Sequence, residues 1–425
     1  MQIPRGCRIG CLTALLIAVV AVVLAVRWWT APIDIPRPQR PPDPVDNPYD
    51  VYRSLAMYTS QIFRNDPMLS YAERELFPSR QTVSLHRPDL ARYLLQQMQP
   101  VRLEYRRHLH KPCAAILEYT PAWQFPELAE FRRWANIESL DMALAVQEGD
   151  YSRAIEDYRT ILLLSEQIRN RGELIHYLVG SAMQATVNRM MGEILQLLPA
   201  RQCEHLVRVV REWEKRYVPP VQAVAVERDF YLTILHDLYA GRYETMRLFA
   251  DHRSIMRWNP RWLNLRRAAR EGMAYFQRVE KELSKPINQQ QAHIEEPRHP
   301  VARLLLPVLN VPGHTVGYTV SRIRLLGCAA AVRAYRLRHG SYPATLNEAG
   351  VADLDKDPFT GGGFVYKPGE QGFLLYSMGR DGKDDGGWRV SERHEGRGDI
   401  TLLPFYGRPV GAGESAEQGE PVWLK

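Results

Sequence analysis

Residues that could do chemistry are few in this sequence, and they are scattered. Two histidines and two glutamates lie within seven residues in the stretch HIEEPRH, from His293 to His299. Zinc proteases hold their metal with two histidines four residues apart on one helix, and Pro297 breaks such a helix here. We therefore interpret this stretch as a polar linker rather than a metal site.

Other patterns of known active sites are missing from the sequence. It contains no GxSxG elbow, no phosphate-binding loop, no dinucleotide-binding glycine fingerprint and no CxxC pair. His108 and His110 lie among basic residues and are interpreted as part of a solvated face. Glu173 and Glu193, in an otherwise apolar segment, are interpreted as exposed or structurally paired. We expect that the protein is not an enzyme; the alternative is an enzyme with an unrecognised active site among the helices.

The composition indicates a folded chain of two or three domains, because 45% of its 425 residues are hydrophobic. The net charge of +7 is compatible with a protein that binds nucleic acid. The arginines, however, are spread along every predicted helix beside acidic residues. We therefore expect no nucleic-acid partner and favour a mild attraction to anionic lipid headgroups.

An apolar run near the N-terminus, residues 9–26, contains no charge, and Trp28 and Trp29 follow it. Its 18 residues would reach ~27 Å as a helix, close to the ~30 Å hydrocarbon core of a bilayer. Aromatic residues at the edge of the run are typical of a membrane interface. The run predicts a transmembrane helix over 9–29, and a cleaved signal peptide is the alternative.

The orientation of this helix sets the predicted location of the rest of the chain. A short basic tail, residues 1–8, favours the cytoplasmic side for the N-terminus. The remaining residues would then be exported. The sequence thus predicts a single-pass protein of the inner (cytoplasmic) membrane, with the lipid bilayer as a partner and the bulk of the chain outside the cytoplasm.

A proline-rich spacer and a long helical region follow. Seven of the 18 residues from Ala31 to Pro48 are proline, so residues 30–48 favour an extended, stiff conformation. Residues 49–296 show apolar side chains at helical spacing in nearly every segment, with Pro100 as an expected interruption. This pattern predicts an irregular α-helical domain.

One helical hairpin in this domain has a recognisable turn. Gly149 suits a left-handed helix end, and Asp150 suits the start of the next helix. The phrase EGDYSRAIEDY resembles the turn and second helix of a tetratricopeptide repeat, in which a small residue such as Ala154 lets two helices approach closely. No second copy follows at a spacing of ~34 residues, so a single repeat-like hairpin is expected.

The C-terminal part has a different pattern. After a polar, proline-bounded boundary at 284–300, a long helix is indicated from Thr315 to Gly340. Short alternating runs then predict strands over Phe364–Tyr366 and Phe373–Ser377, joined by a hairpin turn. A helix followed by a small antiparallel meander is the expected result.

The order of these C-terminal segments is specific. HGSYPATLNEAG, DPFTGGGFVYKPGEQGFLLYSMGRDGKDDGG and a later GDI closely resemble the soluble domain of the type II secretion major pseudopilin, pseudopilin G. The resemblance covers roughly 317–400 and implies a long helix packed on a three-stranded sheet within 312–405, followed by a flexible tail at 406–425. The matching positions are Tyr342-Pro343, Asp357-Pro358, Pro368-Gly369, Tyr376-Ser377 and Gly379 to Gly382.

The resemblance also implies a calcium site. In that family a loop after these strands binds calcium through carboxylates and backbone carbonyls. Asp381 lies at the matching position, and Asp384, Asp385 and Asp399 are carboxylates nearby. Oxygen ligands on a glycine-rich loop suit a hard cation that needs six to eight contacts. The alternative is a solvated turn in which Asp and Gly only satisfy left-handed backbone positions.

The sequence departs from the pseudopilin pattern at its membrane segment. A pseudopilin carries that helix directly before this domain, with a glutamate near its start, whereas the apolar run here lies some 300 residues upstream and contains no acid. Assembly into a pseudopilus is therefore not expected. The predicted fold class is mainly α: a single transmembrane helix, an irregular α-helical domain and a small α+β C-terminal domain. We expect an anchored binding or scaffolding protein with protein partners in the envelope, in the neighbourhood of a secretion apparatus.

Overall fold

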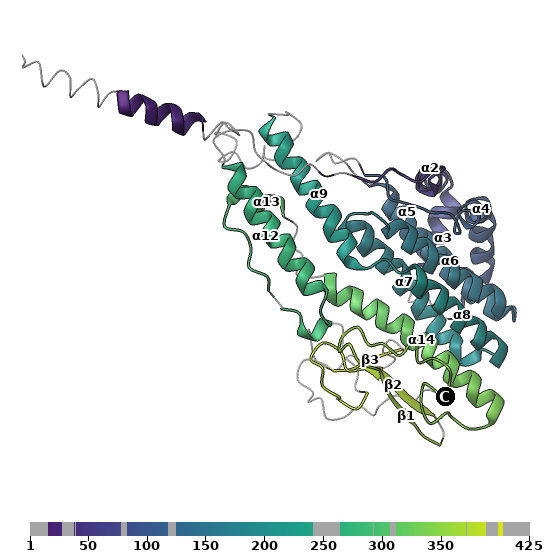
Figure 1. The fold of residues 1–425 in the computed structure, drawn as a ribbon. Coiled ribbons are helices and arrows are strands. Elements are labelled where there is room, and N and C mark those ends of the chain that lie inside the picture. The colour runs from purple at the N-terminus through teal and green to yellow at the C-terminus, as the bar shows by residue number, and fades with distance from the viewer. Residues whose placement is uncertain are drawn as a thin grey trace, which may run out of the picture.

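The computed structural model consists mainly of helices, with a small sheet at one end (Figure 1). It describes residues 16–27, 38, 40–77, 83–117, 125–240, 264–291, 293–306, 312–370, 372–387 and 398–402. The predicted tails at 1–8 and 406–425 and residues 30–37 and 39 of the predicted spacer lie outside these residues.

A helix at 16–27 precedes the rest of the fold, and all of its residues are exposed. The other helices are α2 (Pro48–Asn65), α3 (Pro67–Leu76), α4 (Pro88–Arg107), α5 (Glu127–Gln147), α6 (Tyr151–Arg169), α7 (Leu174–Ile194), α8 (Ala200–Arg216), α9 (Pro220–Tyr239), α12 (Leu265–Leu283), α13 (Pro300–Leu305) and α14 (Pro312–His339), with short 3-10 turns η1 (Leu195–Leu197) and η3 (Ile287–Gln289).

The predicted transmembrane helix is wrong. Among the residues described, no helix combines the length and the apolar character needed to cross a bilayer. Residues 16–27 of the predicted span form the described part of a helix. The other residues of the predicted span 9–29 lie outside the described ones. The single-pass inner-membrane location and the exported bulk were predicted from this helix and are corrected with it, whereas the bilayer as a partner stays a prediction.

The centre of the fold is formed by α5, α6 and α7, which pack against one another. Their side chains are buried on most faces, with Trp134 and Tyr158 fully enclosed. The predicted turn between α5 and α6 is confirmed: Gly149 has φ +77°, and the Asp150 side chain accepts a hydrogen bond from the Arg153 amide at 3.0 Å. A left-handed glycine followed by a capping aspartate explains this sharp reversal.

Helix α4 continues through Pro100, which was expected to interrupt it. A proline inside a helix removes one backbone hydrogen bond and costs roughly 3 kcal/mol. Apolar side chains on both sides of the proline offset this cost, because Met98, Val101 and Tyr105 are all fully buried against the core. Tertiary packing thus overrides the local preference.

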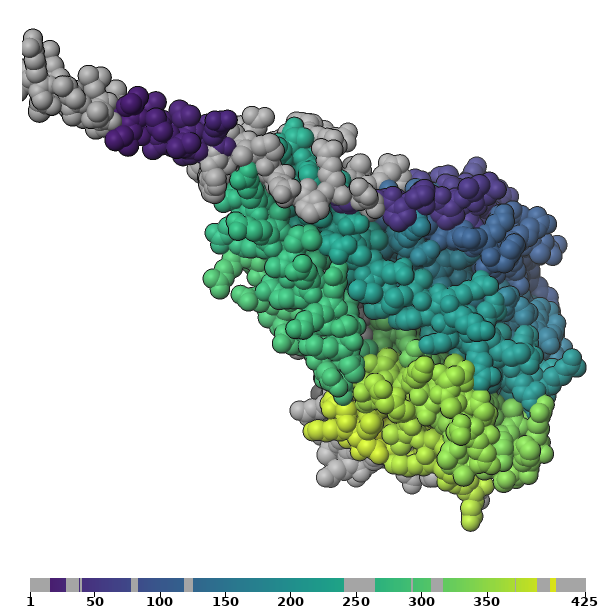
Figure 2. Space-filling view, viewed as in Figure 1, coloured from purple at the N-terminus to yellow at the C-terminus, as the bar shows by residue number. Residues whose placement is uncertain are grey.

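The long C-terminal helix α14 packs against α7 and α8. The approach is close at Gly327, where an added Cβ would lie 2.8 Å from Leu354 and 3.0 Å from Val210. One continuous apolar core joins side chains of α2 to α8, α14 and the sheet. In the space-filling view the yellow-green C-terminal residues lie directly against the teal helices (Figure 2). Helix α14 therefore belongs to the main core as much as to the C-terminal unit.

Helices α9, α12 and α13 form a second apolar core, called here the helical arm. Helices α9 and α12 lie side by side along the edge of the molecule (Figure 1). Gly272 permits their contact, since a Cβ there would lie 2.4 Å from the ring of Tyr231. The Tyr231 hydroxyl also donates to the Ala268 carbonyl at 2.6 Å, which fixes the two helices in register.

The sheet is antiparallel with the order β1-β2-β3, formed by β1 (Val365–Pro368), β2 (Phe373–Ser377) and β3 (Ile400–Thr401). Strand β2 is buried along its whole length and pairs with both neighbours. Helix α14 contacts β2 and β3. The small three-stranded antiparallel sheet expected for this part of the chain is confirmed. The predicted division of the chain at 296 and 312 stays a prediction.

Candidate functional site

The aspartate loop, defined as residues 379–387 together with 398–400, contains the four carboxylates predicted to hold calcium. Glycines give this loop its shape, because Gly379, Gly382, Gly386, Gly387 and Gly398 all have φ between +65° and +90°. Side chains are disfavoured in this left-handed region, so glycine lets the backbone turn sharply and expose its carbonyl oxygens. The two halves of the loop meet where a Cβ on Gly379 would lie 2.6 Å from the Gly398 carbonyl oxygen.

Asp399 is the buried carboxylate of the aspartate loop, with 1% of its surface exposed. Its Oδ2 accepts a hydrogen bond from the Gly387 amide at 2.6 Å. Its Oδ1 is buried and has no hydrogen-bond partner among the described residues. Burial, together with the nearby charges of Asp385 and Asp384, raises the pKa of Asp399 to about 7. A buried carboxylate oxygen without a donor is costly, so this position is favourable for a cation.

Asp384 lies nearby but already has a partner of positive charge. Its Oδ1 accepts from the Tyr376 hydroxyl at 2.6 Å and from the Gly386 amide at 2.9 Å. Its Oδ2 accepts from the Lys367 ammonium at 3.2 Å. Hydrogen bonds from these donors lower the pKa of Asp384, which keeps it ionised. Asp384 is thus held by strand residues and is a poor candidate for direct contact with an ion.

The remaining two predicted ligands are exposed. Asp381 Oδ1 accepts from the Lys383 amide at 3.2 Å, a turn in which the side chain replaces a backbone acceptor. The Asp385 amide donates to Asp399. Within the described part of the loop, no three of the four carboxylates gather at ligand distance. A calcium ion here would therefore need backbone carbonyls as well as Asp399 and Asp385.

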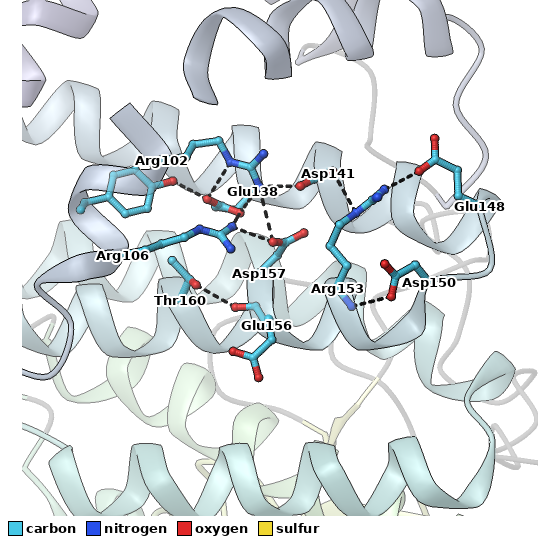
Figure 3. A network of polar contacts seen from close by, with 11 residues as sticks. Arg102, Arg106, Glu138, Asp141, Glu148, Asp150, Arg153, Glu156, Asp157 and Thr160 are labelled. Atoms are coloured by element: carbon cyan, nitrogen blue, oxygen red, sulfur yellow. Dashed lines mark hydrogen bonds and ion pairs between the residues drawn. The ribbon is translucent and has the colours of Figure 1, made fainter. Parts of the chain in front are cut away.

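An acidic triad that the sequence did not reveal lies in the helical part. Glu138 and Asp141 of α5 and Asp157 of α6 are all buried, and their carboxylate oxygens lie within 4.8 Å of one another (Figure 3). In the described ranges this is the only group of three or more such side chains that could hold a metal ion. Charges of one sign at this distance in a buried place require compensation.

Arginines from α4 compensate the acidic triad. Arg102 contacts Glu138 at 2.8 Å and Asp141 at 2.5 Å, and Arg106 contacts Glu138 at 2.5 Å and Asp157 at 2.7 Å. A third guanidinium, that of Arg153, lies 3.5 Å from Asp141. Three positive groups thus face three carboxylates.

The pKa values of the triad follow from this arrangement. Burial disfavours ionised Glu138, but the charges of Arg102 and Arg106 outweigh it and hold its pKa at about 2. Burial and the charges of Glu138 and Asp141 raise the pKa of Asp157 well above its usual range. The Tyr105 hydroxyl also donates to Glu138. The arginines contact at least one oxygen of each carboxylate, while Asp157 Oδ2 has no hydrogen-bond partner among the described residues. We interpret the triad as the clamp that holds α4 on α5 and α6.

The sequence contained a signal for this clamp. Arg102 and Arg106 are four residues apart on one helix face, and Glu138 and Asp141 are three apart on another. Their basic neighbourhood was interpreted as a solvated face, which is wrong for Arg102, whose side chain is only 12% exposed. His108, in the same neighbourhood, contacts Glu104 at 3.1 Å.

A second polar chain runs through the core near the start of α2, α5 and α7. The Tyr49 hydroxyl donates to Glu127 at 3.3 Å, and His176 Nε2 lies 3.0 Å from the same hydroxyl. His176 is fully buried, and its Nδ1 has no partner among the described residues. Burial lowers the pKa of His176 to about 3, so the ring is neutral at physiological pH.

Neutral His176 makes the stability of the protein depend on pH. Below pH 6.5 the His176 ring binds a proton in the unfolded state but stays neutral in the folded state. The free energy of unfolding therefore falls as the pH drops from 6.5 towards 3. The loss amounts to about 1.4 kcal/mol per pH unit in this window. Between pH 7.5 and 5, denaturant titrations of the native chain should therefore show about 2 kcal/mol more loss than those of His176→Gln. Equal losses would mean that folded His176 takes up the proton.

The other residues that the sequence singled out do not come together. Glu173 and Glu193 lie at opposite ends of α7, and Glu193 Oε2 accepts from the Val83 amide at 3.3 Å. Burial and the charge of Glu227 raise the pKa of Glu173 to about 7. His299 is buried at the N-cap position of α13, and its amide donates to Glu271 at 2.7 Å.

Comparisons with known proteins give no family for this arrangement. No family model matches the chain, and neither a curated protein nor a solved structure matches it. The pseudopilin resemblance therefore stays a prediction.

Proposed function

We propose that this chain is a binding or scaffolding protein without catalytic activity, whose C-terminal unit takes up calcium at the aspartate loop. The observation that carries the calcium part is the buried Oδ1 of Asp399, which lacks a hydrogen-bond partner among the described residues. Asp385 and Asp384 add negative charge beside it. A divalent cation would remove both the desolvation cost and the repulsion.

The residues of the loop suit calcium in chemistry as well as charge. Calcium prefers six to eight oxygen ligands in a flexible arrangement. Asp399 and Asp385 would supply carboxylates, and the left-handed glycines allow carbonyl oxygens to turn inwards. The Gly387 amide holds the Asp399 carboxylate by its other oxygen. Bound calcium would supply positive charge that no described side chain supplies to Asp399 Oδ1.

The helical part supports a scaffolding role. Its converging carboxylates, the acidic triad, are neutralised by Arg102, Arg106 and Arg153. Buried charges satisfied in this way hold helices in place. The large shared core gives the chain a rigid frame on which surfaces for partners can be carried. The setting near a secretion apparatus rests on the pseudopilin resemblance alone.

Calcium should raise the melting temperature of the full-length chain. At a free calcium concentration 100 times Kd, binding to the folded state alone adds about 2.7 kcal/mol. Asp399→Asn removes the charge from the buried oxygen and should abolish the increase. Differential scanning fluorimetry with CaCl2, and with MgCl2 as the comparison ion, measures the effect.

A matched control tests whether removing any surface carboxylate abolishes the calcium-induced rise in melting temperature. Asp353 is an exposed aspartate of the same C-terminal unit and pairs with Arg211 at 2.8 Å. Asp353→Asn should keep the full calcium shift. The proposal fails if millimolar CaCl2 leaves the melting temperature of the native chain unchanged, or if Asp353→Asn loses the shift as fully as Asp399→Asn does.

A further inference from the structure

Residues 284–290, called here the strap, run from the end of α12 across the C-terminal unit. The Ile287 amide donates to the Pro358 carbonyl at 3.1 Å, and the Asn288 amide donates to the Phe359 carbonyl at 3.0 Å. These two backbone hydrogen bonds join the strap to the turn at Asp357–Thr360. The stretch belongs to the polar boundary predicted between the helical part and the C-terminal part, and its backbone is paired with the unit that it crosses.

Apolar contacts join the strap to the aspartate loop itself. Ile287, Phe359 and Ile400 form a small buried cluster. Ile400 directly follows Asp399, so the side chain next to the proposed calcium ligand packs on the strap. The packing is tight at Gly317 of α14, where a Cβ would lie 2.2 Å from Ile287. Movement of Ile400 cannot leave Ile287 undisturbed in so close an arrangement.

A chain of hydrogen bonds connects the same two segments by another route. The Gly379 amide donates to Ser377 Oγ at 3.1 Å, and Ser377 Oγ donates to Asp357 Oδ1 at 2.8 Å. The Phe359 amide donates to the same Asp357 oxygen at 2.9 Å. The Phe359 carbonyl then accepts from Asn288. This chain starts in the aspartate loop and ends in the strap.

The Asn288 side chain also lies against the aspartate loop. A Cβ on Gly382 would lie 2.9 Å from Asn288 Nδ2. At its other end the strap is tied to α12 through Glu282, which accepts from Lys285 Nζ at 2.7 Å and from the Gln291 amide at 3.0 Å. The helical arm is thus connected to the loop by continuous short contacts.

We propose that calcium at the aspartate loop also fastens the strap, and through it holds the end of α12 against the C-terminal unit. This inference rests on the proposed calcium binding. The carboxylates of Asp384 and Asp385 lie beside Asp399 in this loop, and a bound cation would offset their mutual repulsion and so order the loop. Because Ile400 and Gly379 belong to that loop, ordering it favours the closed contacts with Ile287 and Phe359.

Coupling of this kind is reciprocal. If calcium favours the fastened strap by some factor, the fastened strap raises the affinity for calcium by the same factor. Removing the strap contacts should therefore weaken calcium binding, although no strap residue is proposed as a ligand. The two factors, one for strap closure and one for calcium affinity, must be equal if the sites are coupled. Simple stabilisation of the loop does not require them to be equal.

Hydrogen exchange of the full-length chain, followed by mass spectrometry, tests the proposal. Isothermal titration with CaCl2 first gives Kd. At free calcium 100 times Kd, the amides of Ile287 and Asn288 should exchange about 100-fold more slowly than in EGTA, because strap opening then requires calcium release. Amides of α5 to α7 should be unaffected, and MgCl2 serves as the comparison ion.

The variant Ile287→Ala/Asn288→Ala removes the strap side chains that meet the loop. It should raise Kd for calcium by the factor by which it reduces the calcium effect on strap exchange. Gln289→Ala is the matched control, since the Gln289 side chain is exposed on the same turn. Unchanged exchange in α5 to α7 shows that the double variant is folded.

The outcomes separate the two proposals. If titration shows calcium binding but calcium does not slow hydrogen exchange in the strap of the native chain, the coupling is overturned and the calcium site stands. If the double variant reduces the calcium effect on strap exchange but keeps the native Kd, the two effects are unequal and the coupling is again overturned. If CaCl2 gives neither heat nor a melting shift, the proposed function itself fails.

Discussion

Replacing Glu138 by alanine should lower the free energy of unfolding by about 3–5 kcal/mol, the range for breaking a buried ion pair. Glu138 is fully buried and receives both Arg102 and Arg106, so its removal leaves two guanidinium groups short of a partner. The Tyr105 hydroxyl loses its acceptor as well. Chemical denaturation followed by circular dichroism measures the loss.

Glu148 offers the control for this experiment. It pairs with Arg92 and Arg153 at the end of the same network, but its side chain is 37% exposed. Pairs at such positions contribute roughly 0–1 kcal/mol, so Glu148→Ala should be close to neutral. Comparable losses for the two variants would contradict the role of the acidic triad as a clamp, because burial would then not decide the effect.

Replacing Glu166 by alanine should have an effect of similar size, about 3–5 kcal/mol. Glu166 Oε1 accepts from Arg169 at 2.8 Å, from Gln184 at 2.6 Å and from the Trp213 indole at 2.7 Å. Its Oε2 accepts from the Val218 amide at 2.9 Å. One carboxylate thus satisfies donors from α6, α7, α8 and the turn before α9, and Arg169 beside it is only 1% exposed. Thermal and denaturant unfolding both report the loss.

A neighbouring ion pair shows what burial adds. Arg159 and Glu212 form two hydrogen bonds, at 2.6 and 2.8 Å, between α6 and α8. Their side chains are 31% and 29% exposed, so water can replace either partner. Glu212→Ala should cost less than about 1 kcal/mol. If it costs as much as Glu166→Ala, hydrogen-bond geometry rather than burial sets the stability of this interface.

Local chemistry in the sequence predicted local structure well. Gly149 and Asp150 specify the turn between α5 and α6 through backbone freedom and side-chain capping, which need no distant partner. The hairpin strand Phe373–Ser377 has the predicted bounds, because its continuous run of apolar residues and the glycines that flank it act within a few positions. Pro100 shows the limit, since packing from other helices decides whether a helix continues through it.

Hydropathy misled for the N-terminal run, because it counts apolar residues without regard to the helix that they form. Among the described residues, no helix has the length and apolar character needed to cross a bilayer. For the calcium site, too, the sequence predicted one part of the outcome and not the other. The position of Asp399 could be read from the sequence, but its burial depends on how 398–400 folds back on Gly387.

The acidic triad could not be found from single segments. Arg102 and Glu138 are 36 positions apart, and their contact exists only once α4 lies on α5. The spacing places like charges on one face of each helix, but neither helix alone shows that the two faces meet. Pairing of charged faces between helices is therefore visible only in the assembled fold.

The place of α14 in the main core has a consequence for how the chain acquires its structure during synthesis. Helix α8 ends at Arg216, and α14, which covers it, begins about 100 residues later at Pro312. A ribosome adds roughly 5–20 residues per second, so the valines of α8 that face α14 stay uncovered for about 5–20 seconds before α14 is synthesised. During that interval the nascent chain presents a bare apolar stripe, the kind of surface that chaperones bind.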